Sequence, residues 1–338
     1  MVRIGLEVMG GDKGPLPALK GVSLALKKTS AKIVAFGQID TLRQISKNLN
    51  LDSDRFSIVE ADQVVLMSDS PTLSLKKKPN SSLKVAFDHL KANLIDALIS
   101  PSNTGAVMVT AIYTLGLFPF LKRPAIGTII PRMREERPFL LVDAGANAEC
   151  DAQELLDFGS LGLTYYRALT SILEPKIALI SNGTEEKKGT DTTRAAYSLF
   201  KTYLGSNFIG YIEGKDLLKE VSDIGVCDGF IGNILLKALE GTAEFVVKFI
   251  KENMKGHPLA ALGLWLMSGH LKRLYYKKLS PSAYGGAPLL GVNGLVLIAH
   301  GASDEFAFLN SILTAEKFVK MGLLKKMEES FISLHSVA

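Results

Sequence analysis

Short apolar runs alternate with amphipathic helical patterns along most of the chain, and this alternation restricts the fold more than any other feature. In the first helical pattern, over residues 16–28, Leu19, Val22 and Leu26 share one face. Near-continuous apolar strands joined by helices are typical of a mainly parallel sheet that is covered on both faces. The sequence therefore predicts an α/β fold. The predicted strands lie at residues 3–8, 31–37, 55–61, 96–100, 138–143, 176–181, 207–212, 224–228 and 295–301.

The size and composition of the chain limit its class. Its 338 residues are 47% hydrophobic and 22% charged, which suits a globular protein with a large core. One large domain and two lobes both fit, so residues 1–338 are treated as a single unit. The net charge of +5 is modest and basic blocks with interleaved aromatic residues are missing, so we do not expect nucleic acid as a partner. The N-terminus lacks the long apolar region of a secretory signal, which predicts a cytoplasmic protein.

Polar turns that contain glycine follow six of the predicted strands. In an open parallel sheet such turns lie along one edge, at the carboxyl ends of the strands, where ligands bind. Glycine allows close approach to the backbone, and helix N-termini offer free N–H groups to an anion. We therefore predict that the turns meet in one cleft that binds a phosphate or a carboxylate, although each turn alone also fits ordinary turn and capping roles. The turns are residues 9–14, 101–105, 143–147, 182–189, 228–233 and 300–304.

Several common catalytic motifs are missing from the sequence. It has neither the dinucleotide-binding G-x-G-x-x-G nor the P-loop in a suitable context, and neither H-E-x-x-H nor G-x-S-x-G. Cys150 and Cys227 lack disulfide or zinc spacing and have no evident histidine partner nearby in the sequence, so a covalent acyl-enzyme is disfavoured. Four of the five histidines have helical or terminal contexts and are predicted to be structural: His89, His257, His270 and His335.

The set of turns and its order resemble one protein family. The segments "MGGD" at 9–12, "SNTGA" at 102–106, "DAGAN" at 143–147, "GTEEKKG" at 183–189, "DGFIGN" at 228–233 and "YGGAPLLGVNGLVLIAHGASD" at 284–304 carry the resemblance. Together they resemble the phosphate acyltransferase (PlsX) family from residue 4 to about residue 315. The resemblance implies an α/β/α sandwich similar to isocitrate and isopropylmalate dehydrogenases and to phosphotransacetylase, usually as a homodimer. It also implies transfer of a fatty acyl group from acyl carrier protein to inorganic phosphate, giving acyl phosphate for phosphatidic acid synthesis, with no metal or organic cofactor.

The mechanism that fits the residues and the resemblance is direct attack of phosphate on the thioester carbonyl. Lys188 is the candidate for electrostatic stabilisation, with a solvated lysine as the alternative, and His300 is a candidate proton acceptor or donor. Asp228 and Asn233 orient a ligand or cap a helix. The candidates for phosphate binding are the backbone and side chains of Gly10, Gly11, Asp12, Asn103, Thr104, Gly105, Asp143 and Asn147.

Five positions depart from the family pattern. Glu7 stands where Asp is common, and Lys13 stands where His often follows the "MGGD" aspartate. Pro101 and Ser102 alter the turn that is usually written "SAGNTGA", Ser102 in place of a glycine, and Pro79 interrupts a basic run. The departures affect the turns at 9–14 and 101–105 and leave the other four motifs intact.

Two surface regions predict macromolecular contacts. An acidic carrier protein would dock on basic side chains, for which Lys76, Lys77, Lys78, Arg132, Arg134 and Arg137 are candidates, with simple solvation as the alternative. Residues 257–279 are apolar and then amphipathic, which predicts either a buried dimer helix or an interfacial anchor on an anionic membrane that includes Trp265 and Leu271–Leu279. The resemblance supports peripheral membrane association.

Three other functions share parts of these features. A phosphotransacetylase-like enzyme that uses acyl-CoA is the nearest alternative. A dehydrogenase of the β-decarboxylating type would share the fold but would need an aspartate cluster for a divalent metal and a nicotinamide pocket. An adaptor that binds a carrier protein or a membrane would not need so many polar turns.

Overall fold

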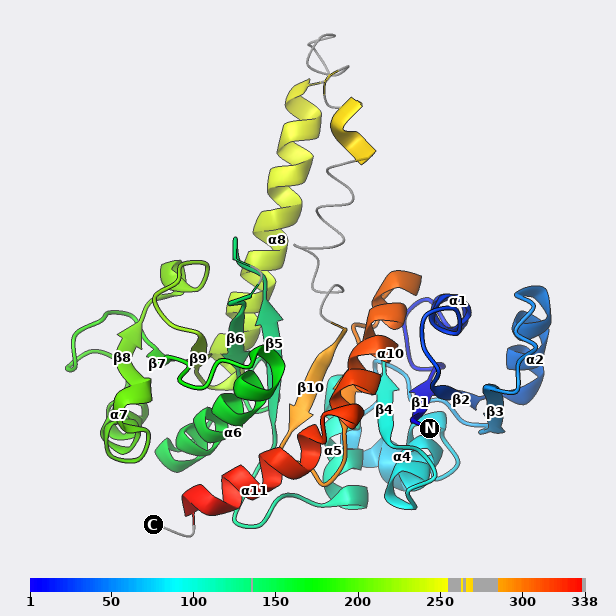
Figure 1. The fold of residues 1–338 in the computed structure, drawn as a ribbon, viewed down its shortest axis with the longest axis horizontal. Helices are drawn as coiled ribbons and strands as arrows, with labels where there is room; N and C mark the ends of the chain where they lie inside the picture. The colour runs from blue at the N-terminus through cyan, green and yellow to red at the C-terminus, as the bar shows by residue number, and fades with distance from the viewer. Residues whose placement is uncertain (135, 255–262, 264–265, 270–284, 336–338) are drawn as a thin grey trace.

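The computed structural model describes residues 1–134, 136–254, 263, 266–269 and 285–335. These residues form an 11-stranded sheet with helices on both faces (Figure 1). The strand order is β3-β2-β1-β4-β11-β10-β5-β6-β9-β7-β8. The predicted α/β fold is thus confirmed.

The strands are β1 (Arg3–Glu7), β2 (Lys32–Gly37), β3 (Phe56–Glu60), β4 (Ala97–Ser100), β5 (Ala125–Ile130), β6 (Phe139–Val142), β7 (Ile177–Ile180), β8 (Phe208–Ile212), β9 (Ile224–Val226), β10 (Ala287–Leu290) and β11 (Val296–Ile298). The helices are α1 (Leu16–Ala25), α2 (Ile39–Asn48), α3 (Pro71–Lys77), α4 (Ser82–Lys91), α5 (Thr104–Leu115), α6 (Ala152–Thr170), α7 (Asp191–Tyr203), α8 (Gly229–Met254), α10 (Glu305–Lys320) and α11 (Leu323–His335), with short 3₁₀ turns η1 (Gly205–Asn207) and η2 (Gly214–Asp216).

All nine strands predicted from apolar runs are present, and the structure adds β5 and β10. Of the ten strand pairings among the described residues, seven are parallel. The other three are antiparallel and follow one another across the sheet, joining β11 to β10, β10 to β5 and β5 to β6. Both added strands therefore belong to the antiparallel part.

The three consecutive antiparallel pairings reverse the direction of the sheet. Strands β1, β4 and β11 run one way, and β6, β7 and β9 run the other way. The turns after β1, β4 and β11 therefore lie at one edge, here called the β1 edge. The turns after β6, β7 and β9 lie at the opposite edge, the β6 edge. The prediction that all six turns share one edge of this chain is wrong, because the sequence pattern did not reveal the two reversing strands.

Alternating side chains of the strands build a core on each face of the sheet. On β6, Leu140 and Val142 pack into one core and Phe139 and Leu141 into the other. Helices α1, α6, α7, α10 and α11 cover the first face, and α4 and α5 cover the second. Burial of each large apolar side chain stabilises the fold by roughly 1.5–3 kcal/mol. The two cores hold the strand ends, and thus the turns, in fixed positions.

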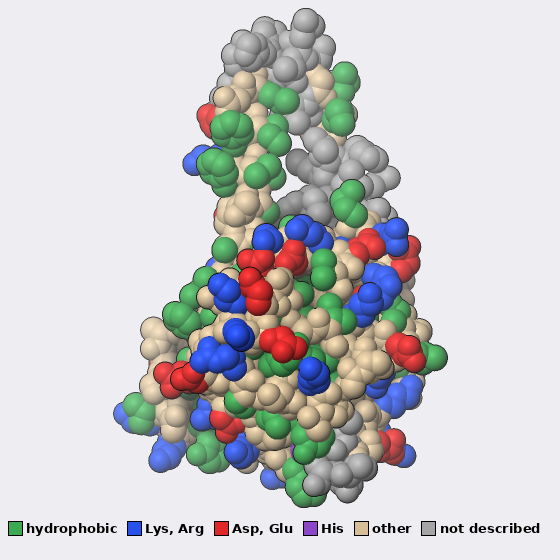
Figure 2. Space-filling view, turned by 90° about the vertical axis from the view of Figure 1, so that its left-hand side faces the viewer, with side chains coloured by type: hydrophobic (Ala, Val, Ile, Leu, Met, Phe, Trp, Pro, Cys, Tyr) green, Lys and Arg blue, Asp and Glu red, His purple; other side chains and the backbone are tan. Residues whose placement is uncertain are grey.

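Helix α8 projects far beyond the sheet and the helices that cover it (Figure 1). Figure 2 shows hydrophobic side chains along this projecting part. The exposed apolar residues of α8 are Phe230, Ile231, Ile234, Phe245, Val246, Val247, Phe249 and Ile250. Soluble monomers rarely expose so many apolar side chains on one helix, so a partner surface is expected to cover them.

The predicted dimer or membrane segment, residues 257–279, lies largely outside the described residues. Trp265 and Leu271–Leu279 are among those that the structure does not describe, as are His257 and His270. Of the described residues in this segment, Leu266 and Met267 are exposed. Within the described parts of the chain, no helix combines the length and apolar character that crossing a membrane requires.

Candidate active site

The Glu7 carboxylate organises the β1 edge. Its side chain is fully buried at the end of β1. Oxygen Oε1 accepts hydrogen bonds from the backbone N–H groups of Met9 and Gly10. The remaining donors are the hydroxyls of Ser82, at 2.7 Å from Oε1, and of Ser100 and Ser102, at 3.1 and 2.7 Å from Oε2. One buried carboxylate thus joins the turn after β1, the start of α4 and the turn after β4.

The turns after β1 and β11 are bonded directly to each other. The Asp12 N–H donates to the Gly301 carbonyl at 2.9 Å, and Lys13 Nζ donates to the Ala302 carbonyl at 2.5 Å. The Ala302 N–H donates to Nδ1 of His300 at 3.1 Å. This bond makes Nδ1 the acceptor, so a neutral His300 carries its proton on Nε2. The exposed His300 ring therefore lies beside the glycine turn with a fixed tautomer.

The turn after β4 starts helix α5 and leaves donors free. Asn103 caps the helix, because its Oδ1 accepts from the Ala106 N–H at 3.1 Å, and its Nδ2 donates to the Met67 carbonyl at 2.7 Å. No hydrogen bond among the described residues uses the N–H groups of Thr104 or Gly105. Such first-turn N–H groups carry partial positive charge and suit an anion.

Exposed apolar side chains border these donors. Leu66, Met67 and Leu73 are 54%, 40% and 50% exposed. They flank Pro71, which packs so closely on Gly105 that a Cβ there would lie 2.8 Å from it. Lys76 and Lys77 are exposed at the end of the same helix, α3. The β1 edge thus combines anion donors, an apolar border and positive charge.

The Asp143 carboxylate organises the β6 edge in a different way. It is fully buried and accepts from the N–H groups of Ile126, Gly145, Ala146 and Asn147 and from Asn147 Nδ2, at 2.7–3.1 Å. Burial raises the pKa of this carboxyl, and the N–H donors oppose that rise. The second proton of the Asn147 amide goes to the Pro124 carbonyl at 2.8 Å. Both side chains are therefore occupied inside the protein, and neither is directed at a ligand.

The other predicted residues of the β6 edge lie around this turn. Asp228 caps α8, because its Oδ1 accepts from the Ile231 N–H at 2.8 Å. Asn233 lies against Gly145, where a Cβ would be 3.5 Å from the Asn233 Cβ. Lys188 is exposed in the turn after β7, and its backbone N–H donates to the Glu185 carbonyl at 2.9 Å. Within this chain, the structure therefore separates Lys188, Asp228 and Asn233 from His300, Asn103 and the glycines of the β1 edge.

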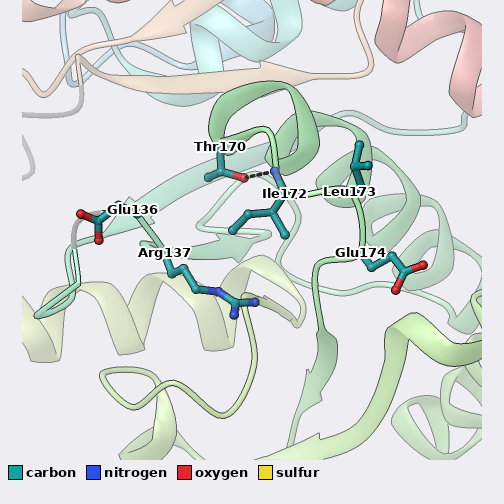
Figure 3. Close-up of a pocket in the computed structure, with 6 residues that line it drawn as sticks. All are labelled: Glu136, Arg137, Thr170, Ile172, Leu173 and Glu174. Carbon is teal, nitrogen blue, oxygen red and sulfur yellow. Dashed lines mark hydrogen bonds between the residues drawn. The ribbon is translucent and has the colours of Figure 1, made fainter.

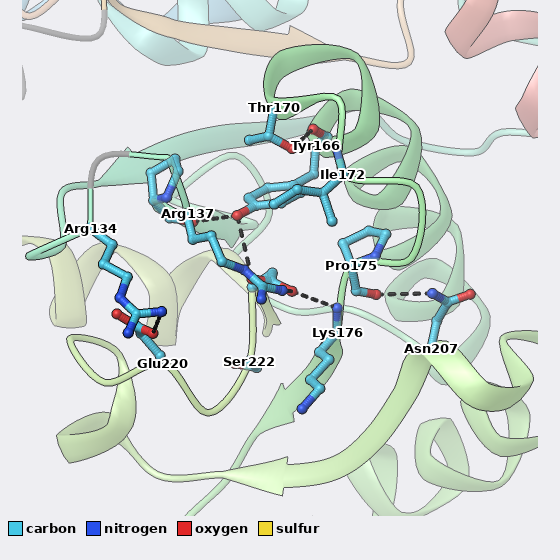
Figure 4. A network of polar contacts seen from close by, with 12 residues as sticks. Arg134, Arg137, Tyr166, Thr170, Ile172, Pro175, Lys176, Asn207, Glu220 and Ser222 are labelled. Atoms are coloured by element: carbon cyan, nitrogen blue, oxygen red, sulfur yellow. Dashed lines mark hydrogen bonds and ion pairs between the residues drawn. The ribbon is translucent and has the colours of Figure 1, made fainter.

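The predicted arginine surface is largely used for internal contacts. Arg132 is buried: its Nε and Nη1 donate to the carbonyls of Leu217 and Ser222, and burial lowers the pKa of its guanidinium. Arg137, which Figure 4 labels, forms a two-point pair with Asp223 at 3.1 and 2.9 Å. The docking role predicted for Arg132 is wrong, because a buried side chain cannot meet a carrier protein. Lys78 is likewise paired, with Asp69 at 2.5 Å.

An open cavity of about 750 Å³ lies beside the Arg137 pair (Figure 3). It is lined by Glu136, Arg137, Thr170, Ile172, Leu173 and Glu174. Of the residues predicted from the sequence, only Arg137 lines it. We therefore place the candidate site at the β1 edge rather than in this cavity.

The thiols and two of the histidines have structural settings. Burial raises the pKa of Cys150 to about 12 and that of Cys227 well above its ordinary value, so both thiols stay protonated at neutral pH. His335 contacts the buried Asp157 at 2.9 Å, and His89 contacts the Val85 carbonyl. Among the described residues, no cluster of three His, Cys, Asp or Glu side chains could hold a metal ion.

Comparison with known proteins decides the family. A family described as fatty acid synthesis protein matches residues 2–326. A phosphate acyltransferase of Dictyoglomus thermophilum is 40% identical over 97% of both chains, and one of Campylobacter concisus is 39% identical over 97% of this chain and 98% of its own. This chain belongs to the phosphate acyltransferase family. As a member of the phosphate acyltransferases, it is an acyltransferase enzyme.

Solved structures show a likeness in fold alone. A phosphotransacetylase of Streptococcus pyogenes has a TM-score of 0.63 at 15% identity and covers 94% of both chains. A 4-hydroxythreonine-4-phosphate dehydrogenase of Klebsiella pneumoniae has a TM-score of 0.53 at 12% identity and covers 94% of this chain and all of its own. The likeness to phosphotransacetylase that the sequence implied for this phosphate acyltransferase family member is confirmed.

Sequence reasoning missed the positions that shape the site. It treated Glu7 and Ser102 only as departures from a pattern, and it gave Met67 no role. A polar residue at the end of a buried strand was the one available signal for Glu7. Nothing in the sequence indicated that Met67 lies beside Asn103.

The bonding of Asp143 yields a stability prediction with a matched control. Asp143→Asn would direct an amide NH₂ at N–H donors, so we expect a loss of about 1–3 kcal/mol in the free energy of unfolding. Asp228→Asn should change it by less than about 0.5 kcal/mol, because Asn caps helices as well as Asp does. Urea unfolding followed by circular dichroism measures both. Equal effects of the two substitutions would contradict the bonding described for Asp143.

Proposed function

We propose that this protein transfers a fatty acyl group from acyl carrier protein to inorganic phosphate, and that phosphate binds at the β1 edge. The observation that carries the proposal is the meeting of three glycine-containing turns, one of which starts α5 with the free N–H groups of Thr104 and Gly105. Exposed Leu66 and Met67 border these donors and suit the acyl chain. The product, acyl phosphate, would serve phospholipid synthesis.

The proposed reaction needs no acyl-enzyme. A phosphate oxygen attacks the thioester carbonyl carbon, and the tetrahedral oxyanion collapses with loss of the carrier's thiolate. Phosphate is already anionic at neutral pH, so binding, orientation and charge stabilisation supply most of the catalysis. The protonated Nε2 of His300 can donate to the leaving thiolate or to phosphate. Asn103 holds the start of α5 and the Met67 carbonyl in place.

Charge on α3 supports a carrier protein as the donor. Lys76 and Lys77 are exposed and adjoin the apolar border, and an acidic carrier would be steered toward them. Coenzyme A also carries negative charge, on its phosphates, so the exposed lysines alone do not distinguish the two donors. The acyl-CoA alternative is therefore tested by direct comparison.

The test compares the two donors under changes of charge and salt. Long-chain acyl carrier protein and the matching acyl-CoA are each supplied with phosphate, and acyl phosphate is detected by mass. We expect the higher kcat/KM with the carrier protein, and this kcat/KM should fall as salt screens charges over about 8–10 Å.

Lys76→Glu/Lys77→Glu should lower the kcat/KM for the carrier protein about tenfold, since two favourable charges are reversed. The control, Lys27→Glu/Lys28→Glu, reverses two exposed lysines that follow α1 and should leave it unchanged. Preference for acyl-CoA and indifference to both pairs would favour the phosphotransacetylase-like alternative.

The proposal also gives a role to the turns of the β6 edge, which lie at the opposite edge of the sheet from the β1 edge within one chain. The protein acts as a homodimer in which the β6 edge of one protomer, with Lys188 and Asn233, completes the β1 edge of the other. The exposed apolar side chains of α8 support self-association, and α8 begins in the β6-edge turn that holds Asp228. Contact with an anionic membrane, through the region of exposed Leu266 and Met267, is part of the same proposal.

Mixing two inactive variants tests the shared site. Thr104→Asp places a carboxylate at the phosphate site, yet aspartate is favourable in the first turn of a helix, so the fold should persist. Lys188→Ala removes the exposed lysine. Each homodimer should lose activity by about a hundredfold or more. After joint refolding, the random mixture should recover about a quarter of wild-type activity, since about half of the dimers are heterodimers and one of the two symmetric sites in each is intact. No recovery, with heterodimers shown by mass, would contradict a shared site, and Thr104→Asn serves as the uncharged control.

A further inference from the structure

We propose that Glu7 is a positioning residue of the phosphate site and that Ser102 is its matched partner, so that the two form one device that aligns the turns after β1 and β4. The proposal rests on the placement of phosphate at the β1 edge. Neither residue is proposed to touch phosphate. Glu7 would act through the backbone of Gly10 and Gly11, and Ser102 through its neighbour Asn103.

The bonds of Glu7 fix two turns relative to each other. Oε1 lies 2.8 and 3.0 Å from the backbone nitrogens of Met9 and Gly10, which sets the orientation of the peptide groups that lead into Gly11. Oε2 lies 2.7 Å from Oγ of Ser102, which directly precedes the helix cap Asn103. A change in the length of the side chain at position 7 must therefore shift at least one turn or break bonds to it.

Close packing makes this arrangement intolerant of small shifts. A Cβ on Gly10 would lie 1.8 Å from Ser102 Oγ and 2.9 Å from Ser102 Cα. The two turns are thus in backbone contact, and only glycine fits at position 10. Ser102 is also nearly fully buried, so its hydroxyl has no access to water as a substitute partner.

The lengths of the two side chains are interdependent. Aspartate at position 7 is one methylene shorter and could keep the nearby N–H groups of Met9 and Gly10, but it would fall short of the Ser102 hydroxyl. A buried hydroxyl that has lost its only acceptor destabilises this arrangement of the turns. Alanine at position 102 removes that hydroxyl, so the shorter carboxylate then leaves one buried donor fewer without a partner, and only Ser82 and Ser100 still depend on its reach. Two sequence departures that look independent are therefore physically coupled.

A double-mutant cycle tests the coupling through the KM for phosphate. Glu7→Asp should raise this KM about tenfold, the equivalent of 1.4 kcal/mol, with kcat within about threefold of wild type. Ser102→Ala should raise it about threefold or less, and Glu7→Asp/Ser102→Ala should bring it back from the Glu7→Asp value toward the Ser102→Ala value, which is less than the product of the two single effects. Glu7→Gln has the same length, and its KM for phosphate should stay within about threefold of wild type. Its Oε1 can still accept from the backbone N–H groups, and its NH₂ can donate to serine hydroxyls that then accept instead of donating.

A control separates positioning from general instability. Arg137→Ala breaks the pair with Asp223 at the amino ends of β6 and β9 and should lower Tm without changing the KM for phosphate. The proposal would be overturned if the two substitutions changed the KM for phosphate independently of each other. It would also be overturned if Glu7→Asp, like Arg137→Ala, lowered Tm and left this KM unchanged. If Glu7→Asp does not fold, a folded double variant with a KM near that of Ser102→Ala supports the coupling, and an unfolded double variant contradicts it. Wild-type protein that fails to use phosphate at all would refute the proposed function instead.

Discussion

The direction of the strands reverses in the middle of the sheet, and this reversal decides which turns can act together. Three antiparallel pairings separate β11 from β6. An odd number of reversals places the carboxyl ends of the two parallel groups at opposite edges. The site at the β1 edge is therefore built from the beginning and the end of the chain, since β1, β4 and β11 are neighbours.

A buried carboxylate stabilises each edge, but the two carboxylates connect different things. Asp143 takes its donors mainly from the turn that follows it, including both nitrogens of Asn147. Glu7 takes its hydroxyl donors from Ser82, Ser100 and Ser102, which lie far along the chain. Each satisfies N–H groups that the end of a strand leaves unpaired, as burial requires. Outside its own turn the Asp143 carboxylate binds, among the described residues, only Ile126 on β5, whereas Glu7 joins three segments of the chain into one surface, and this surface carries the free donors of α5.

The sequence was informative where local pattern determines structure and uninformative where distant packing does. Nine strands followed from apolar runs, because a parallel strand buried on both faces is a continuous apolar segment. Strands β5 and β10 were missed, since "AIGTII" follows a proline and "APLL" contains one between glycines, which is typical of turns. Polar residues after strands predicted one ligand cleft, although the structure places these residues at two opposite edges. Asp143 and Asn147 have the same pattern as the β1-edge residues but are occupied internally, and only tertiary contacts distinguish these cases.

The central claim is that the β1 edge holds phosphate, and diffraction from crystals soaked with arsenate tests it most directly. Arsenate has the shape and charge of phosphate, and its arsenic atom is located by anomalous scattering without reference to activity. The account predicts an arsenic peak beside Gly11, with arsenate oxygens within hydrogen-bond distance of the N–H groups of Thr104 and Gly105. A peak held by residues 143–147 and 228–233, with none of the β1-edge donors in contact, would contradict it.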